Sequence, residues 1–225
     1  MIKCVIFDLD GTLLKTLPTI TYYLNRMHDR YGLPHIDEEV TRGIVGNGAK
    51  NLVRRSLTIG GAPVDEIFEE AYRSYTEEYD RDSSYLTVAY PGMTEMLDGL
   101  LDRGIKLAVY TNKPATCAPD VVRSVFGDRF ARVLGAEPSR PLKPAPDGGL
   151  EVLAELGISP SECAYVGDMT VDAKTAKAMG VALLVLEVWG FGNSAELEGA
   201  GPDAIISHPS ELLSLIDGYN RSGKV

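Results

Sequence analysis

The stretch from Cys4 to Leu14, which reads CVIFDLDGTLL, constrains this chain more than any other. Four apolar residues, two of them β-branched, run directly into Asp8 and Asp10. A short unbroken apolar run of this kind is typical of a strand buried on both faces, and therefore of the middle of a parallel sheet. We expect Asp8 at the carboxyl end of that strand, where open α/β sheets bind their ligands.

Asp8 and Asp10 lie close enough along the chain for their charges to repel each other, so we expect another group to hold these two carboxylates in place. A hard divalent cation has this effect, and Mg²⁺ suits a site with few carboxylates and a phosphate. Gly11 permits a sharp turn, and the hydroxyl of Thr12 can hydrogen-bond the loop. Taken alone, an Asp-Gly-Thr sequence after a strand could be an ordinary turn.

Length and composition describe a soluble globular chain. The 225 residues can form one large domain or a core with a smaller one, and 44% of them are hydrophobic. The formal net charge of -10 argues against nucleic acid or an anionic membrane surface as the main partner. A phosphorylated small molecule remains compatible with it, because local charge decides that binding.

Cysteine usage favours a cytoplasmic protein. Cys4, Cys117 and Cys163 cannot all pair with one another, and sparse, odd cysteines fit a reducing compartment. A charged motif follows the N-terminus within a few residues, so we expect no signal peptide, and no apolar run is long enough to span a membrane.

Residues 15–85 carry helical patterns and no strand pattern. The spacing predicts helices over 18–31 and 63–82, and a third that begins after the Gly46-Asn47-Gly48 segment. We interpret 15–85 as a helical insert between the first strand and the rest of the sheet.

From Pro91 onward, predicted helices and strands alternate. Such alternation predicts an α/β fold, a doubly wound parallel sheet with helices on both faces. We expect the tail over 218–225 to be frayed. Helices are predicted over 93–101, 119–126, 147–156, 171–179 and 209–216, and strands over 105–110, 132–135, 163–166, 181–186 and 204–206.

Two polar motifs follow at later points of this alternation. Thr111 and Asn112 come directly after a predicted strand, where they can hydrogen-bond phosphate oxygens. Lys143 lies in a Lys-Pro-Ala-Pro loop whose prolines stiffen the backbone around one ammonium. Each motif alone could equally be a polar turn or a solvated lysine.

A second pair of carboxylates follows the strand predicted over 163–166. Asp168 is expected at the same sheet edge as Asp8, and Asp172 lies about one turn into the next helix. Such a pair suits the ligands of a metal and their immediate support. The alternative is a helix start that attracts acidic residues through its dipole.

In this order along the chain, the motifs resemble those of the haloacid dehalogenase superfamily, most closely its phosphoglycolate phosphatases and their relatives. The resemblance extends over essentially the whole chain. It implies a Rossmann-like catalytic core formed by 1–14 plus 86–225, and a small inserted helical cap domain over 15–85. The segments that carry it are DGTL (10–13), VGNGA (45–49), YPG (90–92), TNKP (111–114), KPAP (143–146) and VGD (166–168).

The resemblance also implies roles for the acidic residues. Asp8 is expected to attack phosphorus and form an aspartyl-phosphate, and Asp10 to act as general acid and then general base. Mg²⁺ is expected to be held by Asp8, Asp168 and the backbone carbonyl of Asp10, with Asp172 supporting the site.

Other residues are expected to bind substrate or offset charge. The resemblance assigns Thr111, Lys143 and the backbone amide of Asn112 to the phosphoryl group, and we also count Thr12 among the substrate-binding residues.

In the cap, we expect Gly46, Asn47, Gly48 and Lys50 to face a small, anionic leaving group at a helix N-terminus. A glycine hinge followed by a solvated basic helix face is the alternative for these cap residues.

We therefore predict a Mg²⁺-dependent phosphatase acting on a small phosphomonoester such as 2-phosphoglycolate. A pyrophosphatase, a sugar-phosphate phosphatase and β-phosphoglucomutase of the same superfamily remain alternatives, as does a non-catalytic phosphoryl-binding module. Asp10 argues against a dehalogenase, and the lack of a clear imine-forming cap lysine argues against a phosphonatase. A monomer and a homodimer are both compatible with the sequence.

Overall fold

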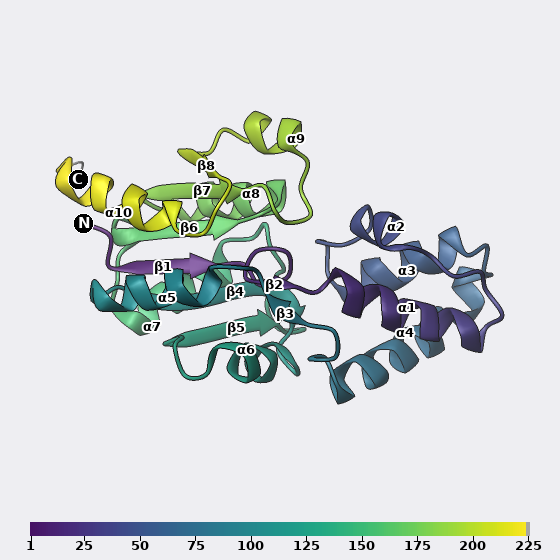
Figure 1. Cartoon of the computed structure of the whole chain (residues 1–225). Helices are drawn as coiled ribbons and strands as arrows, with labels where there is room; N and C mark the ends of the chain where they lie inside the picture. Colours follow the sequence, from purple (N-terminus) through teal and green to yellow (C-terminus); the bar gives the residue numbers. More distant parts are fainter. Residues whose placement is uncertain (224–225) are drawn as a thin grey trace.

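A six-stranded parallel sheet forms the centre of the protein, whose computed structural model describes residues 1–223 (Figure 1). The strand order is β5-β4-β1-β6-β7-β8, so β1 is an interior strand between β4 and β6, as its unbroken apolar run predicts. The strands are β1 (Cys4–Phe7), β4 (Lys106–Pro114), β5 (Arg132–Ala136), β6 (Cys163–Gly167), β7 (Leu183–Glu187) and β8 (Ala204–Ile206).

Helices cover both faces of this sheet, which confirms the predicted doubly wound α/β fold. Alternate residues of β1 point to opposite faces: Val5 and Phe7 join one hydrophobic cluster, Cys4 and Ile6 the other. The first face packs against α5 (Met93–Asp102), α6 (Ala118–Phe126) and α10 (Glu211–Arg221). The second packs against α7 (Asp147–Leu156), α8 (Thr170–Met179) and the short α9 (Ser194–Gly199).

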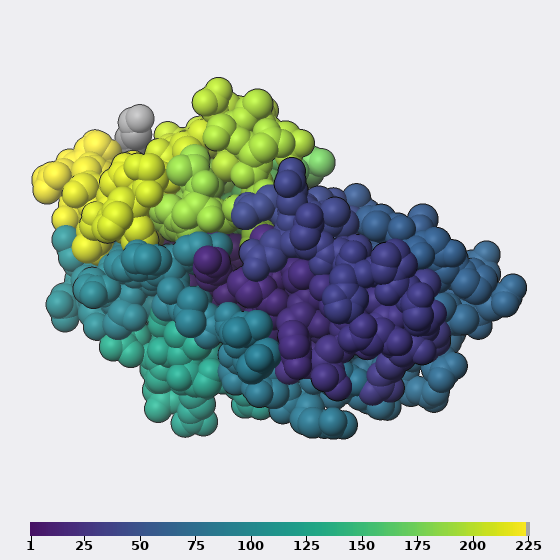
Figure 2. All heavy atoms as spheres, turned by 45° about the vertical axis from the view of Figure 1, so that its right-hand side comes forward, coloured from purple at the N-terminus to yellow at the C-terminus, as the bar shows by residue number. Residues whose placement is uncertain are grey.

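The segment between β1 and α5 forms a separate group of helices with its own hydrophobic cluster. Figure 2 shows this purple and blue part of the chain lying against the rest of the molecule. The predicted helices are found as α1 (Leu17–Arg30), α3 (Ala49–Ile59) and α4 (Val64–Arg81). The sequence analysis missed α2 (Glu38–Arg42), because a helix of one turn is too short to show a period.

Two very short strands join the inserted helices to the core. β2 (Leu14–Lys15) pairs antiparallel with β3 (Val88–Ala89), so the chain enters and leaves the inserted helices side by side. The expectation of no strand over 15–85 is therefore wrong at Lys15. Two residues are too few to show the alternation by which strands are predicted.

The C-terminal helix extends further than expected. α10 continues to Arg221, so the prediction of a frayed tail from residue 218 is wrong for residues 218–221. The amide side chain of Asn220 accepts a hydrogen bond from the backbone of Ile2 at 2.7 Å, and Tyr219 packs against the core. Residues 224 and 225 of the predicted tail lie outside the described residues.

No helix within residues 1–223 combines sufficient length with sufficient apolar character to cross a lipid bilayer.

Candidate active site

Polar residues at the carboxyl ends of β1, β4 and β6 meet at one edge of the sheet. Phe7 pairs with both Val109 of β4 and Val166 of β6, so Asp8 is flanked by the ends of two parallel neighbours. Thr111 lies within β4, which continues beyond the predicted end of the strand. Asp168 directly follows β6. The sheet therefore brings these three side chains to one place, as predicted.

Three buried carboxylates form a cluster at this edge. One oxygen each from Asp8, Asp168 and Asp172 lie within 4.8 Å of one another. The ammonium of Lys143 lies 2.8 Å from Asp8 Oδ1 and 2.7 Å from Asp172 Oδ1. When all four groups are ionised, two negative charges remain in excess, which matches a divalent cation with oxygen ligands.

The carboxylates of Asp168 and Asp8 differ in how many protein donors they engage. Asp168 accepts the Thr12 hydroxyl at 2.8 Å and the Phe191 backbone N–H at 2.7 Å. The Oδ1 of Asp8 is paired with the Lys143 ammonium, whereas its Oδ2 accepts none of the hydrogen bonds found within residues 1–223, and the side chain also lines the neighbouring pocket. Asp8 thus keeps its Oδ2 available for a cation or a substrate.

Asp172 is the carboxylate most occupied by protein donors. Its Oδ1 accepts from Lys143 and, at 3.3 Å, from the Tyr165 hydroxyl, and its Oδ2 accepts the Met169 N–H at 3.1 Å. These contacts favour a supporting role, in which Asp172 holds Lys143 in place. The hydroxyl of Thr12, predicted to bind substrate, donates a hydrogen bond to Asp168 Oδ1.

Burial and mutual repulsion shift the pKa values in this cluster. Burial raises the pKa of Asp8 to about 6, against the attraction of Lys143 and with the help of Asp172. The pKa of Asp168 is also raised, by burial and then by Asp172 and Asp8. Burial opposes the charge of Lys143, but the carboxylates of Asp172 and Asp8 outweigh it, so its pKa lies well above the ordinary value.

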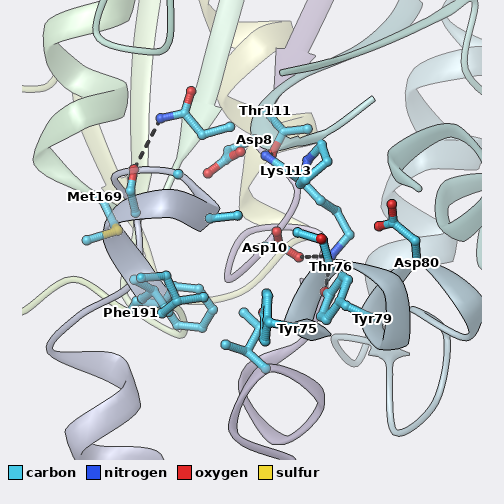
Figure 3. A pocket seen from close by; sticks show the side chains of 18 residues that line it. Asp8, Asp10, Tyr75, Thr76, Tyr79, Asp80, Thr111, Lys113, Met169 and Phe191 are labelled. Carbon is cyan, nitrogen blue, oxygen red and sulfur yellow. Dashed lines mark hydrogen bonds and ion pairs between the residues drawn. The ribbon is translucent and has the colours of Figure 1, made fainter. Parts of the chain in front are cut away.

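Asp10 lines a neighbouring pocket between the sheet edge and the inserted helices, and its side chain points toward Lys113 there (Figure 3). Its Oδ1 lies 3.1 Å from the ammonium of Lys113, which also contacts the Tyr79 hydroxyl of α4. Asp8 and Thr111 line the same pocket. The two carboxylates of the Asp-x-Asp motif therefore have different surroundings, as separate nucleophilic and acid–base roles require.

The side chain of Asn112 holds the Lys143 loop. Its Oδ1 accepts the backbone N–H of Lys143 at 2.8 Å, and its Nδ2 donates to the carbonyls of Lys143 and Gly46, both at 3.2 Å. These contacts tie β4, the Lys143 loop and the inserted helices together beside the pocket.

Of the four residues of the insert that were predicted to face the leaving group, two line the pocket. Gly46 and Gly48 line it, and both have left-handed φ angles, of 98° and 79°. A Cβ at Gly46 would come within 2.8 Å of the Met169 sulfur, so glycine is required for this close approach. Asn47 and Lys50 do not line the pocket: Lys50 is exposed, and its ammonium lies 5.7 Å from the ring centre of Tyr72. Successive helical residues turn by about 100°, which directs Lys50 to solvent.

Several pocket residues escaped the sequence analysis. Lys113 lies inside a motif that was recognised, yet it received no role. Tyr75 and Tyr79 belong to an apolar stripe that predicts a packed helix face, and both also line the pocket. Phe191 comes from a loop after β7 that carries no motif.

That loop connects the inserted helices to the carboxylate cluster. Buried Glu187 accepts two backbone N–H groups of the loop, and burial, followed by the charge of Asp168, raises its pKa to about 10. Arg42 of α2 donates to the Gly190 carbonyl, and the next N–H, from Phe191, donates to Asp168. In the sequence, this loop is marked by one feature, the carboxylate of Glu187 at the end of an apolar strand.

The family model described as haloacid dehalogenase-like hydrolase matches residues 5–186. The chain belongs to this family. The match spans all four motifs and confirms the predicted resemblance.

Similar proteins carry phosphatase names. The chain is 34% identical to a phosphoglycolate phosphatase of Pseudomonas putida, with 94% of this chain and 78% of that protein covered. It is 32% identical to one of Vibrio vulnificus, with 96% of each covered. A solved structure of a predicted phosphoglycolate phosphatase from Haemophilus somnus superposes with a TM-score of 0.89 at 26% identity, covering 96% of this chain and 98% of that one. These comparisons confirm the prediction of an enzyme of the phosphatase kind.

Proposed function

We propose that this protein is a Mg²⁺-dependent phosphatase that hydrolyses a small phosphomonoester through an aspartyl-phosphate, with 2-phosphoglycolate as the first candidate substrate. The observation that carries the proposal is buried Asp8, whose Oδ1 pairs with Lys143 in the carboxylate cluster and whose side chain also lines the pocket that contains Asp10. The names of the relatives supply the candidate substrate.

Within this proposal, residues 15–85 form a cap domain and residues 1–14 plus 86–225 form the catalytic core. The cap contributes one wall of the pocket, and the sheet edge contributes the other. A closed cap excludes water from the reacting phosphate, and its opening can limit turnover. The oligomeric state, a monomer or a homodimer, and the cytoplasmic location stay predictions.

The chemistry falls to four side chains. Asp8 attacks phosphorus with the oxygen that is not paired with Lys143, and Asp10 protonates the leaving oxygen and then takes a proton from the attacking water. Thr111 hydrogen-bonds the phosphoryl oxygens, and Lys143 offsets the negative charge that collects between Asp8 and the phosphate.

The carboxylate cluster fits a magnesium ion. Asp8 and Asp168, with the backbone carbonyl of Asp10, would hold it, and Asp172 would support the site through Lys143. The three clustered carboxylates and the negative charge that Lys143 leaves uncompensated are the features that fit such an ion. When bound, the cation supplies charge stabilisation to the phosphoryl oxygens.

Phosphate release from a panel of phosphate compounds tests this function. We expect Mg²⁺-dependent release that chelation abolishes, with 2-phosphoglycolate preferred over pyrophosphate and sugar phosphates. Release from none of these compounds would overturn the phosphatase proposal. Transfer of phosphate between sugar hydroxyls with little net release would identify a mutase instead.

Asp10→Asn should lower kcat by about 10²- to 10⁴-fold, because the variant loses both the general acid and the general base. The measurement is steady-state phosphate release in saturating Mg²⁺. Asp128→Asn, in an exposed turn of the core, is the matched control and should keep full activity. A kcat for Asp10→Asn close to that of the control would remove Asp10 from the mechanism.

Mg²⁺ affinity should rise as the pH rises through about 6, the value to which burial raises the pKa of Asp8. Below that pH the carboxyl holds a proton and competes with the cation, and above it the carboxylate is free to bind. Calorimetric titration at about pH 5 and about pH 7.5 measures the difference, with Asp168→Asn as the variant that loses affinity at both. Equal affinity at the two pH values would contradict the assignment of Asp8 as a ligand.

A further inference from the structure

Lys113 is a buried cation in the pocket beside the proposed general acid. It is 5% exposed, projects from β4 and lies with its ammonium 3.1 Å from Asp10 Oδ1. In Figure 3 its side chain reaches down from the sheet edge to Asp10 and Tyr79. Among the described residues that line the pocket, it alone carries a positive charge, against Asp8, Asp10 and Asp80.

The ammonium has donor capacity to spare. An ammonium has three N–H donors, and the hydrogen bonds of residues 1–223 give it two oxygen partners, Asp10 and the Tyr79 hydroxyl. Burial disfavours its charge, but Asp10 and then Cys117 outweigh that effect, so the pKa of Lys113 is raised. A charged donor is therefore available at the pocket wall.

We infer that Lys113 binds an anionic group, a carboxylate in the first instance, on the leaving half of the substrate, and so sets the specificity of the enzyme. The inference rests on the proposed function and deepens it. Asp10 must contact the leaving oxygen, and Lys113 lies one hydrogen-bond distance from Asp10. A carboxylate one or two carbons from the ester oxygen can then reach the ammonium at about 2.8 Å.

The surroundings of Lys113 strengthen such a contact. Ile20, Leu52 and Tyr75 line the same pocket, and apolar walls lower the local dielectric and strengthen an ion pair. The N-terminus of α3, whose N-cap residue is Gly48, also lines the pocket. Its backbone N–H groups are the alternative to Lys113 as the binding site of the anionic group. The experiment must separate these two groups.

The specificity test compares 2-phosphoglycolate with ethyl phosphate, which replaces the carboxylate by a methyl group. Lys113→Met should lower kcat/KM for 2-phosphoglycolate by about 10- to 100-fold more than for ethyl phosphate, the range of one charged hydrogen bond. Any effect transmitted through Asp10 acts on both esters, so the ratio isolates the contact with the anion. Lys113→Arg keeps the charge and should keep part of the preference, whereas Lys174→Met, on the exposed side of α8, should leave both values unchanged.

A binding measurement tests the same inference without turnover. Calorimetry of the Asp8→Asn protein with Mg²⁺ should show 2-phosphoglycolate binding at least about 10-fold more tightly than ethyl phosphate, and Asp8→Asn/Lys113→Met should lose that preference. Equal or undetectable binding of the two ligands by Asp8→Asn would overturn the inference. A preference that persists without Lys113 would also overturn it and would assign the anion to the N-terminus of α3. Failure of the proposed function is a different result, the absence of phosphate release by the native protein.

Discussion

Replacing Asp8 with asparagine should abolish phosphate release, with a fall in kcat of at least about 10⁴-fold. An amide cannot attack phosphorus as a carboxylate does, and the variant also loses one ligand of the proposed Mg²⁺ site. The structure supports so large an effect because, among residues 1–223, Asp8 alone belongs to both the carboxylate cluster and the pocket lining. The measurement is phosphate release from 2-phosphoglycolate with Mg²⁺ in excess.

The Asp8→Asn protein should remain folded. The substitution removes a buried negative charge from a cluster with an excess of such charge, so the melting temperature without metal should not fall below that of the native protein. Full activity in Asp8→Asn would refute covalent catalysis by this residue. Lost activity with a collapsed melting temperature would attribute the loss to unfolding instead.

Lys143→Met should destabilise the folded protein by about 3–5 kcal/mol in the absence of metal. Lys143 is 4% exposed, and its ammonium lies between Asp8 and Asp172, which would be left buried without a counter-charge. Activity should fall together with stability, because Lys143 also offsets the charge on the reacting phosphate. Urea unfolding at about pH 7.5 measures the change.

Two further proteins make this prediction specific. Lys143→Met/Asp172→Asn removes one of the stranded charges and should recover part of the lost stability. The matched control is Lys106→Met, which should change stability by less than about 1 kcal/mol, because the exposed Lys106 ammonium donates to a single partner within residues 1–223, the Leu156 carbonyl. If Lys143→Met is as stable as Lys106→Met, the cluster does not depend on Lys143.

The carboxylate cluster was predictable from the sequence because the sheet determines it. Asp8 and Asp168 each follow a buried apolar strand, and parallel neighbouring strands end at one edge. Asp172 follows Asp168 by one helical turn, so its position required only a helix at that point. The local sequence pattern alone did not predict that Lys143 lies in the site. That prediction came from the resemblance to a family.

The pocket was less predictable because it forms between the inserted helices and the sheet edge. The contact of Lys113 with Asp10 and Tyr79 joins residues from three elements that no local period relates. Lys50 was predicted to face the substrate, because it is charged and closely follows Gly48. The helical position of Lys50 in α3 instead directs its side chain to solvent. β2 and α2 were missed because patterns of so few residues carry no period.

Trapping the phosphorylated enzyme tests the central claim most directly. Native protein and Asp10→Asn would be mixed with phosphorus-labelled 2-phosphoglycolate and Mg²⁺, quenched in acid within milliseconds and digested. We predict label on the peptide that contains Asp8, sensitive to hydroxylamine as an acyl phosphate is, and absent from Asp8→Asn. Rapid phosphate release with no label on that peptide at any quench time, in either protein, would contradict covalent catalysis at Asp8.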